Sequence, residues 1–178
     1  MSIAQGQLFG PANALPEGFV YVEEFIDAAE ERALLDAVAA LPLEEARYKE
    51  YTARRRIALF ERAMPEFLLP LRERIAAWLD LPPAALEHAL VNEYRPGTPL
   101  GWHRDAPTYG RVAGVSLGGS ARMRLRPYAA TKAECIDLHL SPRSAYRMEG
   151  PARWRWQHSI AATPGLRYSI TFRTRRSG

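Results

Sequence analysis

"RYSITFRT" (residues 167–174) alternates polar and apolar side chains over eight positions near the end of the chain. Successive side chains of a β-strand point to opposite faces, so one face of this strand would carry Tyr168, Ile170 and Phe172. The opposite face would carry the polar set: Arg167, Ser169, Thr171 and Arg173. A half-buried strand with a solvated polar face is the simpler interpretation. The alternative is that both arginines point into a polar pocket.

Further short strands are predicted upstream, separated by Gly and Pro. "RMRLRPY" (122–128) alternates in the same way, with Met123 and Leu125 on one side and arginines on the other. The predicted strands cover residues 88–95, 111–117, 121–127, 135–140, 144–148, 155–161 and 166–174. Many short strands with frequent turn signals favour a sandwich or a barrel.

Two helices are predicted before these strands. Asp27 is a candidate N-cap with Glu30 at capping-box spacing, and apolar residues follow at helical spacing as far as Leu41. A second helix is predicted from about Pro65 to Leu79. The expected fold is therefore mainly β, with two N-terminal helices packed on one outer face of the β body.

The composition is ordinary for a soluble globular protein: 178 residues, 47% hydrophobic, with a formal net charge of +4. We expect a single domain over residues 1–178, in which residues 1–18 form a partly ordered arm. No signal peptide or membrane span is predicted, and a cytoplasmic location is expected. Cys135, the single cysteine, cannot form an internal disulfide and is expected in the core. The basic charge permits nucleic-acid binding but does not indicate it.

The stretch "GWHRDAPTYG" (101–110) contains residue types suited to metal binding. In an extended segment His103 and Asp105 project to the same side. Two histidines and one carboxylate on one face of an iron ion leave positions open for a co-substrate and oxygen. His158, in a later predicted strand, could supply the third ligand. By itself, however, His-x-Asp is also typical of a surface ion pair or a turn.

Taken together, these segments resemble the AlkB family of Fe(II)- and 2-oxoglutarate-dependent dioxygenases. The resemblance rests on "NEYRPG" (92–97), "HRD" (103–105), the later His158 and "RYSITFR" (167–173), in that order. It extends over about residues 45–175. The resemblance implies a double-stranded β-helix, or jelly roll, over residues 86–175. It also implies Fe(II) as cofactor, with 2-oxoglutarate and O2 as co-substrates.

The resemblance also implies a role for individual residues. The catalytic iron ligands would be His103, Asp105 and His158. Arg167 would pair with the distal carboxylate of 2-oxoglutarate, and Arg173 would lie near the carboxylate that chelates iron. Three further residues would line the co-substrate site: Asn92, Tyr94 and Ser169.

Two positions depart from the family pattern. Ser169 stands where many relatives have Asn, which would weaken one hydrogen bond to the co-substrate. Pro107 stands where several relatives have an acidic residue that reads the damaged base. The second departure leaves the iron site intact and leaves the substrate open.

The implied function is oxidative demethylation of N-alkylated nucleic-acid bases, as in repair of alkylation damage. The methyl group would leave as formaldehyde while 2-oxoglutarate gives succinate and CO2. Because the base must be exposed, the expected partner is single-stranded DNA or RNA, or a flipped base, bound by a monomer. The alternatives are an Fe(II)/2-oxoglutarate hydroxylase or demethylase of protein or a small molecule, and a metal-binding module without turnover.

Candidate substrate residues come from two regions. Residues 45–60, "EARYKEYTARRRIALF", resemble the family's nucleotide-recognition lid, and they are alternatively an exposed edge strand. Aromatic side chains interleaved with cations suit stacking and phosphate contact. The candidates in this region are Tyr48, Tyr51, Arg54 and Arg55. Trp102 and Trp156 are candidates for the wall or mouth of the cavity, although Trp102 is equally well explained as a core aromatic.

Overall fold

The computed structural model describes residues 14–47, 52–129 and 135–177. One antiparallel sheet contains β1 (Phe19–Val22), β2 (Glu44–Arg47), β3 (Thr52–Glu61), β4 (Leu86–Tyr94), β6 (Tyr109–Leu117), β9 (Ala145–Met148) and β11 (Arg167–Arg175). A second antiparallel sheet contains β5 (Leu100–His103), β7 (Ala121–Pro127), β8 (Ile136–Leu140) and β10 (Trp156–Ile160). The helices are α1 (Ala28–Ala39), α2 (Leu69–Trp78) and the short α3 (Gly150–Trp154), with 3-10 turns η1 (Glu66–Leu68) and η2 (Pro83–Ala85).

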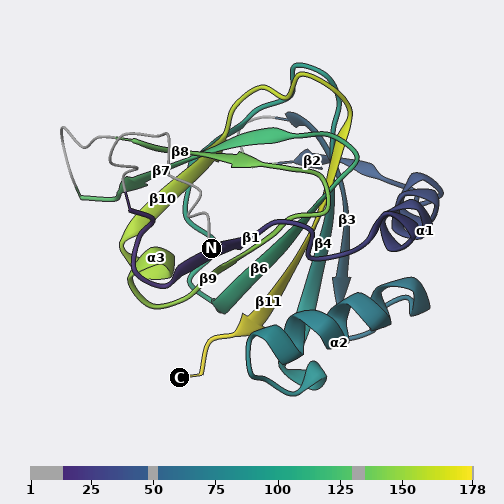
Figure 1. The fold of residues 1–178 in the computed structure, drawn as a ribbon, viewed down its shortest axis with the longest axis horizontal. Helices are drawn as coiled ribbons and strands as arrows, with labels where there is room; N and C mark the ends of the chain where they lie inside the picture. The colour runs from purple at the N-terminus through teal and green to yellow at the C-terminus, as the bar shows by residue number, and fades with distance from the viewer. Residues whose placement is uncertain (1–13, 48–51, 130–134, 178) are drawn as a thin grey trace, which may run out of the picture.

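The strand order of the larger sheet is β1-β9-β6-β11-β4-β3-β2, and that of the smaller sheet is β5-β10-β7-β8. The two sheets face each other and form the predicted jelly roll, with α1 and α2 on the outer side of the larger sheet (Figure 1). All seven predicted strands are present, each within two residues of its predicted ends. The prediction missed β1, β5 and α3, which are short elements with little periodicity to detect, and it gave the region of β2 and β3 as an edge strand only in the alternative interpretation.

Strand β11 occupies a central position in the larger sheet, between β4 and β6. Its register places Ser169 opposite Asn92 of β4 and opposite Ser116 of β6. Because side chains opposite each other in a sheet share a face, the polar residues of these three strands gather on one side. That side faces the smaller sheet.

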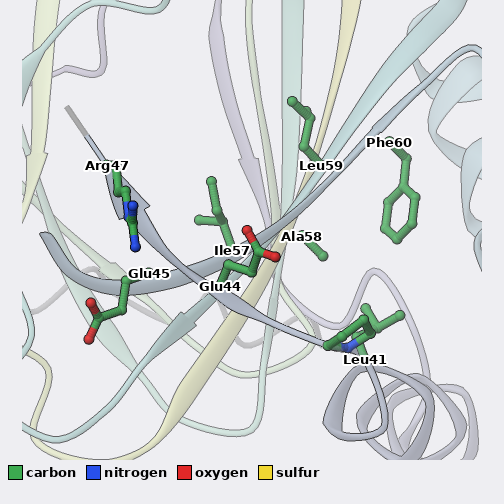
Figure 2. Close-up of a pocket in the computed structure, with 9 residues that line it drawn as sticks. Leu41, Glu44, Glu45, Arg47, Ile57, Ala58, Leu59 and Phe60 are labelled. Carbon is green, nitrogen blue, oxygen red and sulfur yellow. The ribbon is translucent and has the colours of Figure 1, made fainter. Parts of the chain in front are cut away.

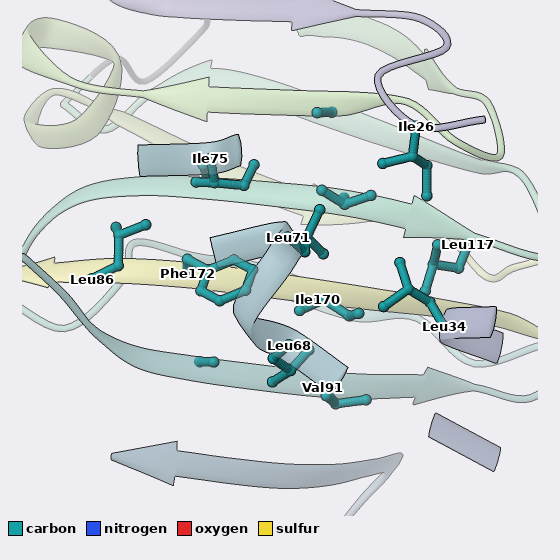
Figure 3. Packing of buried hydrophobic residues seen from close by; sticks show 14 of the residues in the cluster. Ile26, Leu34, Leu68, Leu71, Ile75, Leu86, Val91, Leu117, Ile170 and Phe172 are labelled. Atoms are coloured by element: carbon teal, nitrogen blue, oxygen red, sulfur yellow. The ribbon is translucent and has the colours of Figure 1, made fainter. Parts of the chain in front are cut away.

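The opposite side of β11 belongs to a hydrophobic core shared with the two helices (Figure 3). Ile170 and Phe172 are fully buried against Leu34 of α1 and Ile75 of α2. The predicted capping box of α1 is present: Asp27 Oδ1 accepts from the Glu30 amide at 2.8 Å, and Glu30 Oε2 accepts from the Asp27 amide at 2.9 Å. The prediction that two helices cover one outer face of the β body is therefore confirmed.

A second core fills the space between the sheets. Met123 and Leu125 of β7 are each 1% exposed and point into it, as the alternation predicted. The arginines at positions 122, 124 and 126 consequently lie on the outer face of the smaller sheet.

Two expectations about less regular segments need correction or refinement. Cys135 is exposed, so the expectation of a core cysteine was wrong. It lies one residue before β8, outside the alternating segment that buries its neighbours. Within the described end of the predicted arm, the carbonyls of Glu17 and Gly18 accept from the amides of Ala152 and Glu149, which fixes that end against α3. Among the described helices, none has both the length and the hydropathy needed to cross a membrane.

Candidate active site

The pairing of β5 with β10 brings two distant histidines together. His158 lies directly opposite His103 in the ladder, and the ring centroids are 4.2 Å apart. Asp105 follows β5 by two residues, and its Oδ1 is 3.9 Å from His103 Nε2 and 3.6 Å from His158 Nε2. The ligand atoms of all three side chains lie within 4.8 Å of one another, close enough to share one metal ion.

The tautomer of His103 is fixed by its surroundings. Its Nδ1 lies 2.8 Å from the carbonyl oxygen of Gly101. A carbonyl can only accept, so Nδ1 carries the proton and donates it. The lone pair is therefore on Nε2, the nitrogen that faces Asp105 and His158, which is the usual way in which a second contact orients a ligating histidine.

The protonation states in this cluster suit a cation. Burial, reinforced by the neighbouring His103, lowers the pKa of His158 to about 3. Burial likewise lowers the pKa of His103. Burial alone would raise the pKa of Asp105, but Arg173 and then His158 outweigh it and hold that pKa well below its usual range. The cluster thus offers two neutral imidazoles and one carboxylate, the protonation states that metal ligation requires.

Arg173 is the residue that fixes the carboxylate. Its Nε donates to Asp105 Oδ2 at 2.5 Å. His88, opposite Arg173 in the β4–β11 ladder, places Nδ1 3.4 Å from Arg173 Nη1. Its ring contacts that of Tyr109 at a tilt of 50°, with the centroids 4.5 Å apart. Neither His88 nor Tyr109 was predicted. The spacing of His88 from Asn92 along one strand was the signal that could have found it, since residues four apart in a strand share a face.

A second group of polar side chains lies deeper in the same cavity, which has a volume of about 40 Å³. Arg167 is 2% exposed, and its Nε and Nη2 donate to Ser116 Oγ at 3.2 and 2.7 Å. Asn92 Nδ2 donates to Ser169 Oγ at 3.2 Å. Tyr94 lies with its ring centroid 5.0 Å from the Arg167 guanidinium carbon. All eight residues predicted for iron and 2-oxoglutarate line this one cavity: Asn92, Tyr94, His103, Asp105, His158, Arg167, Ser169 and Arg173.

Two atoms in this group are buried without a hydrogen-bond partner among the described residues: Arg167 Nη1 and Asn92 Oδ1. The buried guanidinium of Arg167 contacts the hydroxyl of Ser116 and the ring of Tyr94, both of which are uncharged. A buried cation is costly unless an anion lies next to it. A carboxylate entering the cavity would supply that anion and would accept from Nη1. The donor set therefore fits an acidic ligand such as 2-oxoglutarate.

Tyr146, which lines one side of the cavity, was not predicted, because its position depends on a glycine in the neighbouring strand. Tyr146 of β9 lines the cavity and is opposite Gly114 of β6. A Cβ added at Gly114 would lie 2.7 Å from the Tyr146 ring, so only glycine lets that ring lie across β6. Burial raises the pKa of Tyr146 to about 12, so its hydroxyl stays protonated.

The predicted substrate residues of the 45–60 region do not all lie at the cavity. The described part of this region is the β2–β3 hairpin at the edge of the larger sheet, which is the edge-strand interpretation. Arg55 is 8% exposed and lines the cavity, whereas Arg54 is exposed and does not. Arg56 forms an ion pair with Glu93 at 2.7 Å. Tyr48 and Tyr51 lie outside the described residues.

The two predicted tryptophans are not among the residues that line the cavity. Trp102 precedes His103 in β5, and because His103 points inward Trp102 points outward, where the Arg126 guanidinium carbon lies 4.1 Å from its ring centroid. Trp156 packs against the core between the sheets. The expectation that Trp102 forms a wall beside the substrate therefore does not match its position.

A larger hollow lies elsewhere on the surface. It has a volume of about 900 Å³ and runs between the end of α1 and the β2–β3 hairpin, past Leu41, Glu45 and Leu59 (Figure 2). None of the three clustered metal-binding candidates lines it. The small cavity is the candidate active site because the clustered His103, Asp105 and His158 line it.

Comparison with known proteins agrees with this geometry. The family model described as "2OG-Fe(II) oxygenase superfamily" matches residues 28–173. The chain belongs to the 2OG-Fe(II) oxygenase superfamily. Its members use Fe(II), 2-oxoglutarate and O2, so the protein is a dioxygenase and an oxidoreductase.

Among curated proteins, this oxygenase is 30% identical over 174 residues to the Arabidopsis thaliana "Alkylated DNA repair protein ALKBH8 homolog", covering 80% of this chain and 50% of that one. It is 30% identical over 103 residues to the Danio rerio "Probable RNA/DNA demethylase ALKBH6", covering 53% of this chain and 43% of that one. The oxygenase therefore spans about half the length of these relatives.

Among solved structures, it resembles OsALKBH1 with a TM-score of 0.67 at 16% identity, covering 90% of this chain and 100% of that one. It resembles a Pseudomonas putida prolyl-4-hydroxylase with a TM-score of 0.65 at 20% identity, covering 90% of this chain and 94% of that one. These likenesses show a shared fold. The predicted membership of the AlkB family is supported by the family match and by the two curated relatives.

Proposed function

We propose that this oxygenase is an Fe(II)/2-oxoglutarate-dependent demethylase of N-alkylated nucleic-acid bases. The observation that carries the proposal is the likeness, over 80% of the chain, to a relative named for repair of alkylated DNA. The clustered His103, Asp105 and His158 support the oxidative part of the proposal, because their ligand atoms lie within 4.8 Å of one another.

Iron would be held by His103 and His158 through Nε2 and by the carboxylate of Asp105. Two imidazoles and one carboxylate on one side of the ion leave open positions for a co-substrate and O2. Bound iron, 2-oxoglutarate and O2 together supply the oxidising chemistry that hydroxylates a methyl group and gives succinate and CO2. The hydroxylated methyl group then leaves the base as formaldehyde.

2-Oxoglutarate would be held by the deeper group of polar side chains. Arg167, whose Nη1 is buried without a partner among the described residues, would donate to the distal carboxylate. Asn92, Tyr94 and Ser169 would contact the remainder of the co-substrate. Arg173 would orient Asp105, since its Nε already donates to Oδ2.

The test is formaldehyde release from single-stranded oligonucleotides that carry 1-methyladenine or 3-methylcytosine, with Fe(II) and 2-oxoglutarate supplied. We expect formaldehyde and succinate in equal amounts, and neither above background with a His103→Ala variant. Succinate release without formaldehyde from any methylated oligonucleotide would contradict a nucleic-acid substrate.

The alternative is hydroxylation or demethylation of a protein or a small molecule. Pro107, at the position where several AlkB relatives read the base with an acidic residue, is the observation that favours it. Pro107 is exposed and lines a neighbouring cavity that contains Arg104 and Arg153. If formaldehyde release fails, stimulation of succinate production by peptides or metabolites would support this alternative.

A further inference from the structure

The outer face of the smaller sheet carries an unusual concentration of arginine. Because Met123 and Leu125 point into the core, Arg122, Arg124 and Arg126 point outward from β7. The neighbouring strand β10 places Gln157 and Ser159 opposite Arg126 and Arg124, with Ser159 itself buried, and β5 beyond it adds Trp102. We call these six residues the arginine face.

The guanidinium groups of the arginine face are held in place. Arg126 Nε donates to Gln157 Oε1 at 2.9 Å, and Arg124 Nε donates to Ser159 Oγ at 3.2 Å. Both guanidinium groups also lie over the Trp102 ring, 4.1 and 5.1 Å from its centroid. In each group, a hydrogen bond holds the Nε edge and the Trp102 ring contacts the guanidinium. Because the side chain is already ordered, it loses less conformational entropy when a ligand binds.

The charge on the arginine face is poorly balanced. Among the described residues in ion pairs, the one carboxylate next to it is Asp137 of β8, whose Oδ2 is 3.8 Å from Arg122 Nη1. Alternate residues along a strand are separated by about 6.6 Å, so the three arginines repel one another on the same side. An extended polyanion would relieve this repulsion and would match the repeat of the arginines.

The arginine face is continuous with the active-site loop. Trp102 is followed directly by His103, and β5 is an edge strand of the smaller sheet. Beyond it, Arg104 lies over the ring of Tyr128 at 3.7 Å, and the two residues line a cavity of about 390 Å³ together with Asp105 and Gln157. Cationic and aromatic side chains therefore lead from the candidate iron-ligand loop to the outside of the sheet.

We propose that the arginine face binds the phosphates of the single-stranded nucleic acid that flank the target base. This inference rests on the proposed function, because it requires a nucleic-acid substrate. Arginine is suited to phosphate because its planar fork can donate two parallel hydrogen bonds. Aromatic side chains beside cations are typical of surfaces that bind single strands.

The experiment measures binding of an unmodified single-stranded 12-nucleotide DNA by fluorescence anisotropy at several salt concentrations. For the double variant Arg124→Gln, Arg126→Gln, we expect Kd to rise about tenfold near physiological salt, and the slope of log K against log salt to shrink by about 1.4. The matched control is the double variant Arg32→Gln, Arg62→Gln, which removes the same charge from exposed positions on α1 and after β3. We expect the control to match the wild type in both quantities.

Equal salt slopes for the two double variants would overturn the proposal, and so would failure of the wild type to bind the oligonucleotide at low salt. If loss of the Trp102 contacts unfolds the first variant, as judged by Tm, Arg122→Gln decides the question. Its side chain is 58% exposed, and we expect the slope to shrink by about 0.7. Formaldehyde release tests the proposed function independently of these salt slopes. If the wild type releases formaldehyde but the arginine variants keep its salt slope, only the proposed role of the arginine face is refuted.

Discussion

The two faces of β11 are built from alternate residues of one strand, yet they have opposite surroundings. On the helix side, Ile170 and Phe172 are fully buried among apolar side chains. On the cavity side, Arg167 is just as well buried, but a hydroxyl and a tyrosine ring lie next to its charge, and its Nη1 has no hydrogen-bond partner in the described part of the chain. One face stabilises the fold by removing apolar area from water, whereas the other keeps a charge buried at a cost.

In this oxygenase, a cavity that buries a charge is part of a sheet that is stabilised by apolar packing on its other face. A buried cation without a counter-ion destabilises the folded state unless other interactions compensate. The apolar face of β11 lies in the same backbone ladder, so its packing holds the polar side chains in position. Stability and ligand binding are therefore expected to respond separately to substitutions on the two faces.

The largest expected effect is on the cavity side, at the iron ligands. His103→Ala removes one of the two imidazoles, and we expect metal content after anaerobic Fe(II) loading and succinate production to fall to background. The control is His139→Ala, an exposed histidine on β8. Retained turnover in His103→Ala would show that the triad is not the metal site.

The next effect belongs to the helix side. Phe172→Ala opens a cavity in the core and is expected to lower the free energy of unfolding by about 3–5 kcal/mol, measured by urea denaturation. The control Leu59→Ala, at a side chain 51% exposed, should cost much less. The folded fraction of Phe172→Ala should still bind Fe(II), because the change is on the face opposite the cavity. Loss of metal binding in fully folded protein would mean that the two faces do not act separately.

A third substitution isolates the co-substrate part of the cavity. Arg167→Met removes the charge-assisted hydrogen bonds proposed for the distal carboxylate, so the KM for 2-oxoglutarate should rise about 10- to 100-fold. Iron binding should be unchanged. Adding 2-oxoglutarate should raise the Tm of the wild type but not that of the variant. An unchanged KM would exclude Arg167 from the co-substrate site.

The smallest expected effect concerns His88, behind Arg173. Burial, and then Arg173, lowers the pKa of His88 to about 4. As the pH falls below about 6.5 the unfolded chain takes up this proton first, so the free energy of unfolding decreases between about pH 6.5 and pH 4. His88→Gln should remove that part of the acid sensitivity, about 1–2 kcal/mol at pH 5. The measurement is urea denaturation at pH 5 and pH 7, and equal pH dependence in both proteins would contradict the shifted pKa.

Much of the fold was predictable because its signals are local. The alternation of residues 167–174 and 122–128 depends on the two-residue repeat of a strand, and the Asp27–Glu30 capping box depends on residues three apart. The missed strands β1 and β5 contain four residues each, which gives few positions for a periodicity to be recognised.

The site was predictable in its parts but not in its assembly. His103 and Asp105 could be paired from their spacing, and His158 could be offered as a third ligand from its later strand, but only the family resemblance favoured the complete set. Residues that support the site without a motif were missed. Ser116 meets Arg167 only through the register of β6 against β11, and Gly114 matters only because Tyr146 lies across it.

By itself, the sequence determined which side chains of each strand share a face, where the first helix begins, and which residue types are available for iron and a diacid. Only the tertiary structure decided that the polar face of β11 is buried around a cavity and that Trp102 points away from it. The physical reason is that periodicity is a property of one strand. Burial, pKa and metal geometry depend on which strands lie next to it and in which register.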